Sequence, residues 1–396
     1  MALVRGHDAN TGMLFAEQTT WGTPALVYST NTMTAFSRMP IVRETLTLNR
    51  EAFQKSREQG LSGATEYVEY GRQVIQGEVV VQPRYNAPWF HIWMAHAMGD
   101  EIRDTDRYND AETVVANVNR HSYAFATTAA LGLTVRMAKA GTNVAGPYEQ
   151  FSGLVITGFT WDQPEDAPCQ VTFRCLAKYD GVTALGGAIP AVANDQVHVP
   201  IRARDLAVTP GTKSKFHVGF PITATTTGLT YQLNFRSFKL TVDKHIDLES
   251  SFLNTPDAFD QPGASETRDV TLEVNTFLED DYAAQHKPFY DFANRHPSGA
   301  SKANIVYYAS VDEVFASNGY IWRMELPALY WEAADPSAKE AGAIPTSWRG
   351  RGIKGTTLVP NTGSHPTSTD LRMVSAVKDA ALVAGGDADA NFTASL

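Results

Sequence analysis

A segment with the pattern of a β-strand runs directly into a segment with the pattern of an α-helix, and the chain contains this unit twice. In Val74–Gln82 apolar and polar side chains alternate, whereas Pro88–Met98 is an uncharged run rich in aromatic residues. Alternation predicts a strand with one buried face, and proline favours the first turn of a helix. The second unit comprises Val270–Leu278 and Pro288–Arg295. Any fold for this chain must accommodate both units.

The offsets between matching residues indicate a duplicated domain. Pro88 matches Pro288 at an offset of 200, and Glu78 matches Glu273 at an offset of 195. Length differences confined to connections are typical of diverged copies, whereas a solenoid would repeat roughly every 20–50 residues. The offset of 200 also relates an earlier pair of strands, through Val42, Leu46 and Leu48 in one and Val242, Ile246 and Leu248 in the other.

Short runs rich in Val, Thr, Phe and Tyr, separated by turn residues, predict a mainly β fold. We expect two tandem β-sandwich or barrel domains, each with a short α-helix packed on the sheet. The predicted domains are 1–200, with an N-terminal arm, and 201–356, and we interpret 357–396 as a weakly structured tail or small decoration. The predicted strands are Ile41–Leu48, Val74–Gln82, Leu154–Trp161, Cys169–Lys178, Phe235–Leu248, Val270–Leu278, Ile305–Ser310 and Ile321–Leu329.

The strand of each unit has one apolar and one polar face. Because an apolar sheet face must be buried, we expect the adjacent helix to cover it. The core-facing helix residues are then Trp89, Phe90 and Trp93 in the first copy and Phe289, Tyr290 and Phe292 in the second. The opposite face is polar and mildly acidic, and it carries Gln76, Glu78, Gln82, Asp269, Thr271, Glu273 and Asn275.

Two long polar connections, Asn49–Tyr70 and Glu249–Glu266, lie at the same place in each copy. Loops of about 15 residues or more without structure of their own are usually functional or ordered by a partner. We therefore expect these connections to be contact segments.

The sequence contains no motif from which an active site or metal centre can be assembled, so we predict no enzyme, no catalytic or metal-binding residues and no cofactor. The segment "GRGIKG" (Gly350–Gly355) matches a nucleotide-binding glycine pattern, but it follows no clear strand and precedes no helix. We interpret it as a flexible turn. The basic residues beside and within it, Arg349, Arg351 and Lys354, are interpreted as solvated charges, with phosphate or the acids of a neighbouring subunit as alternative partners.

The two cysteines, Cys169 and Cys175, fall on one face of one predicted strand. Six residues of strand span about 20 Å, which is too far for a disulfide. Two buried, small hydrophobic side chains are the expected outcome.

The formal net charge of −10 argues against a protein that grips nucleic acid, which needs clustered basic residues, but not against one that lets DNA pass. No apolar run approaches the roughly 20 residues of a membrane-spanning helix, and no secretory signal is visible. We expect a soluble protein, made in a cytoplasm, with no membrane partner.

Several segments, taken in order, resemble bacteriophage tail tube (major tail) proteins of long-tailed phages, in the version with a duplicated domain. The first is "EQTTWGTPA" (Glu17–Ala25), and the second is the first strand-and-helix unit, residues 71–99. The third is the hairpin pattern of Tyr148–Lys178, and the last is "ASETRDVTLEVNTFLEDDY" followed by "KPFYDFAN". Together these segments span roughly residues 17–335.

The resemblance implies a structural subunit of closed, stacked rings, in which each domain contributes a sheet to one inner barrel. Six domains per ring, with two per chain, imply a homotrimer with pseudo-sixfold symmetry. The lumen would conduct DNA without specific binding and would hold a tape-measure protein. Tail terminator and distal tail proteins are the other implied partners, and the location is the virion tail, assembled in the cytoplasm of the host bacterium.

The resemblance also gives a role to each face and loop. The polar-face residues named above would face the lumen, where acidic and amide groups repel phosphate. The long connections would contact neighbouring subunits or the next ring, through Arg50, Phe53, Lys55, Arg57, Glu58, Tyr67, Phe252 and Phe259.

Two alternatives stay open. The tube of a contractile injection device would share the fold, and a neighbouring sheath gene would identify it. A carbohydrate-binding or decoration β-sandwich protein of the virion would need exposed aromatic side chains, and the seven Trp and fifteen Tyr motivate it.

Overall fold

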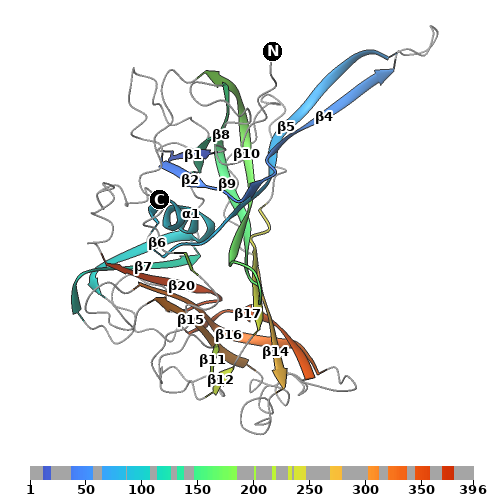
Figure 1. The fold of residues 1–396 in the computed structure, drawn as a ribbon. Helices are drawn as coiled ribbons and strands as arrows, with labels where there is room; N and C mark the ends of the chain where they lie inside the picture. Colours follow the sequence, from blue (N-terminus) through green and yellow to red (C-terminus); the bar gives the residue numbers. More distant parts are fainter. Residues whose placement is uncertain are drawn as a thin grey trace.

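The described part of the chain consists mainly of antiparallel β-strands and includes one α-helix (Figure 1). The mainly β prediction is therefore confirmed. The structure is a computed structural model, which describes residues 12–18, 37–56, 65–85, 87–107, 114–125, 132–137, 147–184, 200–201, 216–219, 231–233, 236–246, 268–278, 302–311, 320–336, 344–356 and 368–378.

The elements fall into two groups along the chain. The first group comprises β1 (Gly12–Glu17), β2 (Ser37–Pro40), β3 (Arg43–Glu44), β4 (Thr47–Ser56), β5 (Thr65–Val81), α1 (Pro88–Met98), β6 (Gly99–Arg107), β7 (Val114–Phe125), β8 (Leu133–Met137), β9 (Pro147–Gln163) and β10 (Gln170–Ala184). The second group comprises β11 (Phe216–Gly219), β12 (Tyr231–Leu233), β13 (Ser237–Asp243), β14 (Asp269–Leu278), β15 (Lys302–Val311), β16 (Tyr320–Pro336), β17 (Ile344–Ile353), β18 (Gly355–Thr356), β19 (Ser368–Thr369) and β20 (Arg372–Lys378).

The two groups share one strand order. In the first, hydrogen-bonded neighbours run β2–β1–β8–β9–β10–β5–β4, with β3 also on β5. In the second they run β12–β11–β15–β16–β17–β14–β13. We call β1–β10 with α1 the first repeat and β11–β17 the second repeat. The β6–β7 hairpin has no counterpart in this order among the described strands.

The strand pairings correct one of the offsets between the repeats. Gln76 pairs with Thr47, and Thr271, which lies 195 positions after Gln76, pairs with Thr241. The offset from β4 to β13 is therefore 194, not 200. Exposure agrees, because Val42 is 57% exposed whereas Val242, its partner at an offset of 200, is fully buried. Sequence matching aligned similar residues, but the ladder decides which of them are equivalent.

Two ladders join the repeats. Residues 158–163 of β9 pair with residues 238–243 of β13, which makes one sheet of the two repeats. Elsewhere β20 lies between β7 of the first repeat and β16 of the second, and pairs with both. Arg372 at its start is fully buried, and its Nε donates to Ser122 Oγ at 2.8 Å. The expectation of a weakly structured tail is wrong for residues 368–378, because the edges of β7 and β16 bind residues 372–378 and β19 pairs with β18.

The helix has the predicted bounds, Pro88–Met98, and its two ends follow from sequence. Pro88 occupies the first turn, where no N–H partner is lost. Gly99 ends the helix in the left-handed region, with a φ of 101°, and its N–H bonds to Ala95 O. The second predicted helix, Pro288–Arg295, and its residues Phe289, Tyr290 and Phe292 lie outside the described residues.

The helix covers the apolar face of the sheet, as its pattern predicts. Trp89, Phe90 and Trp93 are buried, and Trp93 packs 5.3 Å from Phe173 of β10 and 6.0 Å from Phe15 of β1, between ring centroids. Burial of such aromatic side chains is a dominant contribution to core stability.

Residues of both repeats share this core. Trp322 of β16 is fully buried, and its ring lies 5.4 Å from both Phe90 of the helix and Trp161 of β9. It also stacks on Tyr123 of β7 at 5.9 Å. One contiguous core therefore spans the two repeats, and β16 supplies its link.

The predicted strands are largely confirmed, although most run longer. Six of them fall on β5, β9, β10, β14, β15 and β16, and Phe235–Leu248 contains β13. Ile41–Leu48 is interrupted, because Thr45 and Leu46 separate β3 from β4. "GRGIKG" is not a flexible turn. It forms the end of β17 and continues into β18, and Gly350 is buried in the ladder between β14 and β16.

The shared core predicts a single unfolding transition. Trp322→Ala should lower the free energy of unfolding by about 3–5 kcal/mol and shift the whole transition, because the cavity opens between the repeats. Trp322→Phe, which keeps an aromatic ring, should cost less. Circular dichroism during thermal unfolding measures both, and two separate transitions, only one of them shifted, would contradict a shared core.

A partly buried lysine makes a polar contact between the repeats. Lys244 follows β13, and its Nζ donates to His96 O near the end of the helix at 3.2 Å. Burial, with a further contribution from the charge of Arg268, lowers the pKa of Lys244 to about 7. In the unfolded chain the pKa is about 10.4, so the unfolded state binds more protons between these values.

Stability should therefore rise with pH across this window in a way that depends on Lys244. The free energy of unfolding of the wild type, minus that of Lys244→Met, should increase from about pH 7 to about pH 10. Urea denaturation at several pH values measures this difference. A difference that stays constant over the window would show that Lys244 is as well solvated in the folded as in the unfolded chain.

Candidate functional site

The polar face of the joined sheet crosses both repeats without a break. The residues predicted to share it lie on β5 or just after it (Gln76, Glu78, Gln82) and on β14 (Asp269, Thr271, Glu273, Asn275). All seven are half-buried or exposed, and they alternate with buried Val79, Val81, Val270, Leu272 and Val274. Because β9 pairs with β13, the two sets belong to one surface.

This face is balanced in charge and not mildly acidic as the pattern of two strands suggests. Basic residues from neighbouring strands stand beside the acids. Arg349 Nε lies 3.9 Å from Glu273 Oε1, Arg351 Nη1 lies 3.6 Å from Asp269 Oδ1, and Arg43 Nη2 lies 3.8 Å from Glu78 Oε2. Two of these arginines come from β17, which pairs with β14, and one comes from β3, which pairs with β5. Local sequence patterns do not show these pairings. Arg349 and Arg351 thus pair with acids of their own chain.

A row of threonines crosses the junction of the repeats. Thr172, Thr160, Thr241 and Thr271 are successive cross-strand partners on β10, β9, β13 and β14. All four side chains are half-buried. Threonine suits a pleated surface with one solvated side. The row gives the middle of the face a neutral, hydroxyl-bearing strip.

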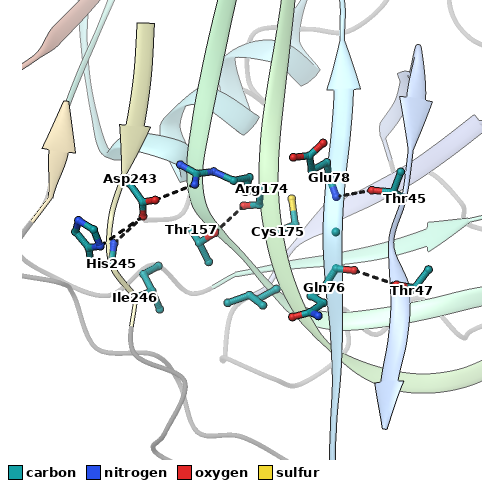
Figure 2. A pocket seen from close by; sticks show the side chains of 12 residues that line it. Thr45, Thr47, Gln76, Glu78, Thr157, Arg174, Cys175, Asp243, His245 and Ile246 are labelled. Atoms are coloured by element: carbon teal, nitrogen blue, oxygen red, sulfur yellow. Dashed lines mark hydrogen bonds and ion pairs between the residues drawn. The ribbon is translucent and has the colours of Figure 1, made fainter. Parts of the chain in front are cut away.

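An arginine bridges the junction of the repeats, and we call this arrangement the clamp. Arg174 lies on β10, and its guanidinium crosses β9 to reach β13 (Figure 2). Its Nη1 donates to Asp243 Oδ2 at 2.8 Å, and its Nη2 donates to Val242 O at 2.7 Å. The strand that it crosses carries Gly158 at the position paired with both Arg174 and Asp243.

Glycine at position 158 is required by this close approach. A Cβ there would lie 2.5 Å from Arg174 Nη2 and nearer still to Val242 O, closer than real Cβ atoms come to other atoms. The guanidinium therefore lies where a side chain would otherwise stand. Glycine inside a strand is a known sign of such an approach.

The clamp holds its aspartate ionised. Partial burial alone would raise the pKa of Asp243, but the backbone N–H of His245 and the guanidinium of Arg174 outweigh burial and lower it. His245 N donates to Asp243 Oδ1 at 3.1 Å, and its Nε2 lies 2.8 Å from Asp269 Oδ2. The junction is thus a small network of paired charges.

A shallow hollow of about 560 Å³ lies beside the clamp on the polar face. Figure 2 shows that residues of both repeats line it, with Glu78 and Thr45 on one side and Asp243 and His245 on the other. The hollow is wide open and carries no catalytic constellation. The part of the chain that the structure describes holds no cluster of three or more potential metal ligands.

The two cysteines are buried, and neither forms a disulfide, as predicted. Burial raises the pKa of both thiols, with Asp162 adding to the effect at Cys169 and Glu78 at Cys175. A thiol held protonated is a poor nucleophile. Both residues therefore serve as small hydrophobic side chains.

The first long connection is a hairpin arm and not a loop without structure. Asn49–Ser56 continues β4, Thr65–Tyr70 opens β5, and the two strands pair with each other. Figure 1 shows this two-stranded ribbon projecting away from the rest of the molecule. The predicted contact residues on it are Arg50, Phe53 and Lys55 of β4 and Tyr67 of β5. Arg57, Glu58, Phe252 and Phe259, with the second connection, lie outside the described residues.

Sequence reasoning missed the clamp, although two of its signals were present. Arg174 alternates with the buried residues of its strand, and Gly158 interrupts an apolar strand. Local sequence patterns do not show that Asp243, 69 positions after Arg174, lies beside both residues.

No helix among the described residues has the length and apolar character needed to cross a membrane. A search of curated proteins finds no match to this chain. A family model described as "Phage tail tube protein" matches residues 8–293, which is more than half of the chain. The match covers the strands of the first repeat, the clamp and β11–β14 of the second. The chain belongs to the phage tail tube protein family.

Proposed function

We propose that this tail protein is the repeating subunit of a tube whose stacked rings conduct DNA, and that each ring closes by pairing strands of successive copies. Family membership supports a structural tail component. The observation that supports the proposed ring is the junction inside the chain, where β9 and β13 join two similar repeats edge to edge. The same junction can recur between chains.

The second repeat offers the counterpart of the β9 edge. β9 has β10 along one edge, and β8 and β13 share the other. Its counterpart β16 has β17 along one edge and β15 on the other, but β15 pairs only as far as Tyr330. Within the described residues no strand covers this edge at residues 331–336, and 333–336 correspond to residues 158–161 of the β13 site on β9.

The first repeat offers the counterpart of β13. β13 lies between β14 and β9, whereas β3 and β4 pair only with β5 among the described strands. Leu48, equivalent to fully buried Val242, is only half-buried, and nearby Val42 is 57% exposed. A second copy laying its β16 along this edge would cover Leu48, as β9 covers Val242.

Such an interface uses two different edges, so each copy leaves one edge of each kind for the next. Interfaces of this type close into rings or continue as filaments. Open strand edges are strong templates for pairing. Three copies supply the six repeats of the pseudo-sixfold ring that the family resemblance implies.

In this ring the polar face lines the channel. Its acids pair with arginines, so DNA meets a hydrated face with no continuous basic tract to hold phosphate. A tape-measure protein would occupy the same channel before ejection. Terminator and distal tail proteins would cap the ends of the tube, which assembles in the host cytoplasm.

The hairpin arm is the candidate contact to a neighbouring subunit or ring. Its outer part, beyond the residues that pair with β10, is a ribbon of only two strands. Such ribbons are marginally stable alone in water. A surface on another copy would supply the missing packing.

The register of the proposed interface can be tested by a disulfide. By equivalence with Asp243 and Gly158, Asn49 of one copy should pair with Ala333 of the next. Paired residues in antiparallel strands have Cα atoms about 4.5–5.5 Å apart, within reach of a disulfide. The variant Asn49→Cys/Ala333→Cys should, on oxidation, give covalent species of two and three chains on a non-reducing gel, and none larger.

The controls are Asn49→Cys alone and Asn49→Cys/Ala334→Cys, in which the second cysteine is displaced by one residue. Cys169 and Cys175 are buried and do not compete. Covalent species of six chains would refute the trimer. Equal cross-linking in the displaced pair would refute the register.

Removing the arm should separate folding from assembly. Replacing residues 52–70 by a short turn keeps the part of β5 that pairs with β10, so the thermal unfolding midpoint should change little. The variant should not form tubes in negative-stain images. Tubes of normal length from this variant would exclude the arm as an essential contact.

A further inference from the structure

The junction inside the chain and the proposed junction between chains differ at the clamp. Inside the chain, Glu78, Arg174, Gly158 and Asp243 follow one another across β5, β10, β9 and β13 as cross-strand partners. The two hydrogen bonds from Arg174 to Val242 O and Asp243 Oδ2 cross β9 and bind β13, the second strand beyond its own. This junction is held by its ladder and by a charged bridge.

The proposed junction between chains carries the same row, but with two changes. Glu273 pairs with Arg349, and Arg349 pairs with Ala333, so these residues stand where Glu78, Arg174 and Gly158 stand in the first repeat. The arginine is thus present at the equivalent position. Gly158 is replaced by Ala333.

The acceptor is changed as well. Asp243 pairs with Asp269, and Asn49 pairs with Val74, which lies 195 positions before Asp269. Asn49 of the next copy therefore stands where Asp243 stands inside the chain. The ionised acceptor becomes a neutral amide, and alanine adds a Cβ at a position where a Cβ blocks the crossing of a guanidinium. Arg349 lies instead beside Glu273, at 3.9 Å.

We propose that each ring contains two chemically different junctions: one inside each chain, locked by the clamp of Arg174, Gly158 and Asp243, and one between chains, which lacks the clamp because Ala333 and Asn49 occupy the equivalent positions. The proposal rests on the proposed ring. Rings then come apart between chains and not within them. A second copy is the partner of the unclamped edge. A wrongly joined copy can dissociate at this junction during assembly, while the junction inside each chain stays closed.

The first test uses the isolated chain and does not depend on ring formation. Arg174→Met and Asp243→Asn should each increase amide hydrogen exchange in β13 residues 238–243 at least about tenfold, while α1 stays protected. Gly158→Ala should do the same if it folds. Thr160→Val, on the same face of β9 but outside the clamp, is the matched control. Unchanged exchange in the two charge variants would overturn the locking role.

The second test transplants the clamp. Asn49→Asp/Ala333→Gly should raise the urea concentration at which rings dissociate into single chains, without raising the midpoint of unfolding of the single chain. The gain should exceed the sum of the two single variants, because the bridge needs both changes, and it should vanish when Arg349→Met is added. Size-exclusion chromatography with light scattering measures dissociation.

The outcomes separate this inference from the function on which it rests. If wild-type chains form rings but the transplant gives no gain, or a gain that survives Arg349→Met, two distinct junctions are refuted and the tube subunit stands. If wild-type chains form no rings under any assembly condition, the proposed function fails, and the unclamped junction fails with it. In that case the exchange results decide only whether the clamp locks the single chain.

Discussion

The hydrogen bonds between β9 and β13 are the interaction on which the rest of the molecule depends. This ladder places two similar sheets edge to edge, so that their polar faces form one surface and their apolar faces enclose one core. The threonine row and the clamp exist only because the ladder sets the register between the repeats. It also leaves two unlike edges at the ends of the joined sheet, and this geometry makes a closed assembly of identical chains possible.

Aromatic residues in the core stabilise the joined sheet from its apolar face. Trp89, Trp93, Trp161, Trp322 and Trp348 are all buried. The tryptophan content that motivates a carbohydrate-binding alternative is thus largely used inside the molecule, since a sugar-binding surface needs exposed rings. Because Trp322 reaches from the second repeat into the core of the first, the angle between the repeats is set by close packing as well as by the ladder.

Local patterns predicted the features that depend on neighbours in sequence. The helix Pro88–Met98 was predictable from its proline and glycine ends, and the two faces of β5 and β14 from alternation. Local patterns do not predict the features that are set by pairing between distant strands. The charge balance of the polar face needs arginines from β3, β10 and β17, and the clamp joins residues far apart in the chain. The arm has no apolar stripe in sequence, so its pattern predicts a loop, and only the pairing of β4 with β5 makes it a ribbon. Residues 372–378 form a short strand of mixed composition whose two neighbours, β7 and β16, are distant in sequence.

The position of β20 has a consequence for biosynthesis. It is the last of the described strands to leave the ribosome, yet it lies between β7 and β16, which are made earlier. Until it arrives, both edges are open and available to unwanted strands from other chains. A chain cut short before residue 370 keeps these edges exposed, and it also lacks the Arg372 contact to Ser122 and the Asp370 contact to Arg268. Truncated products therefore expose two strand edges that favour aggregation or proteolysis, and in the finished chain β20 closes these two edges before chains meet one another.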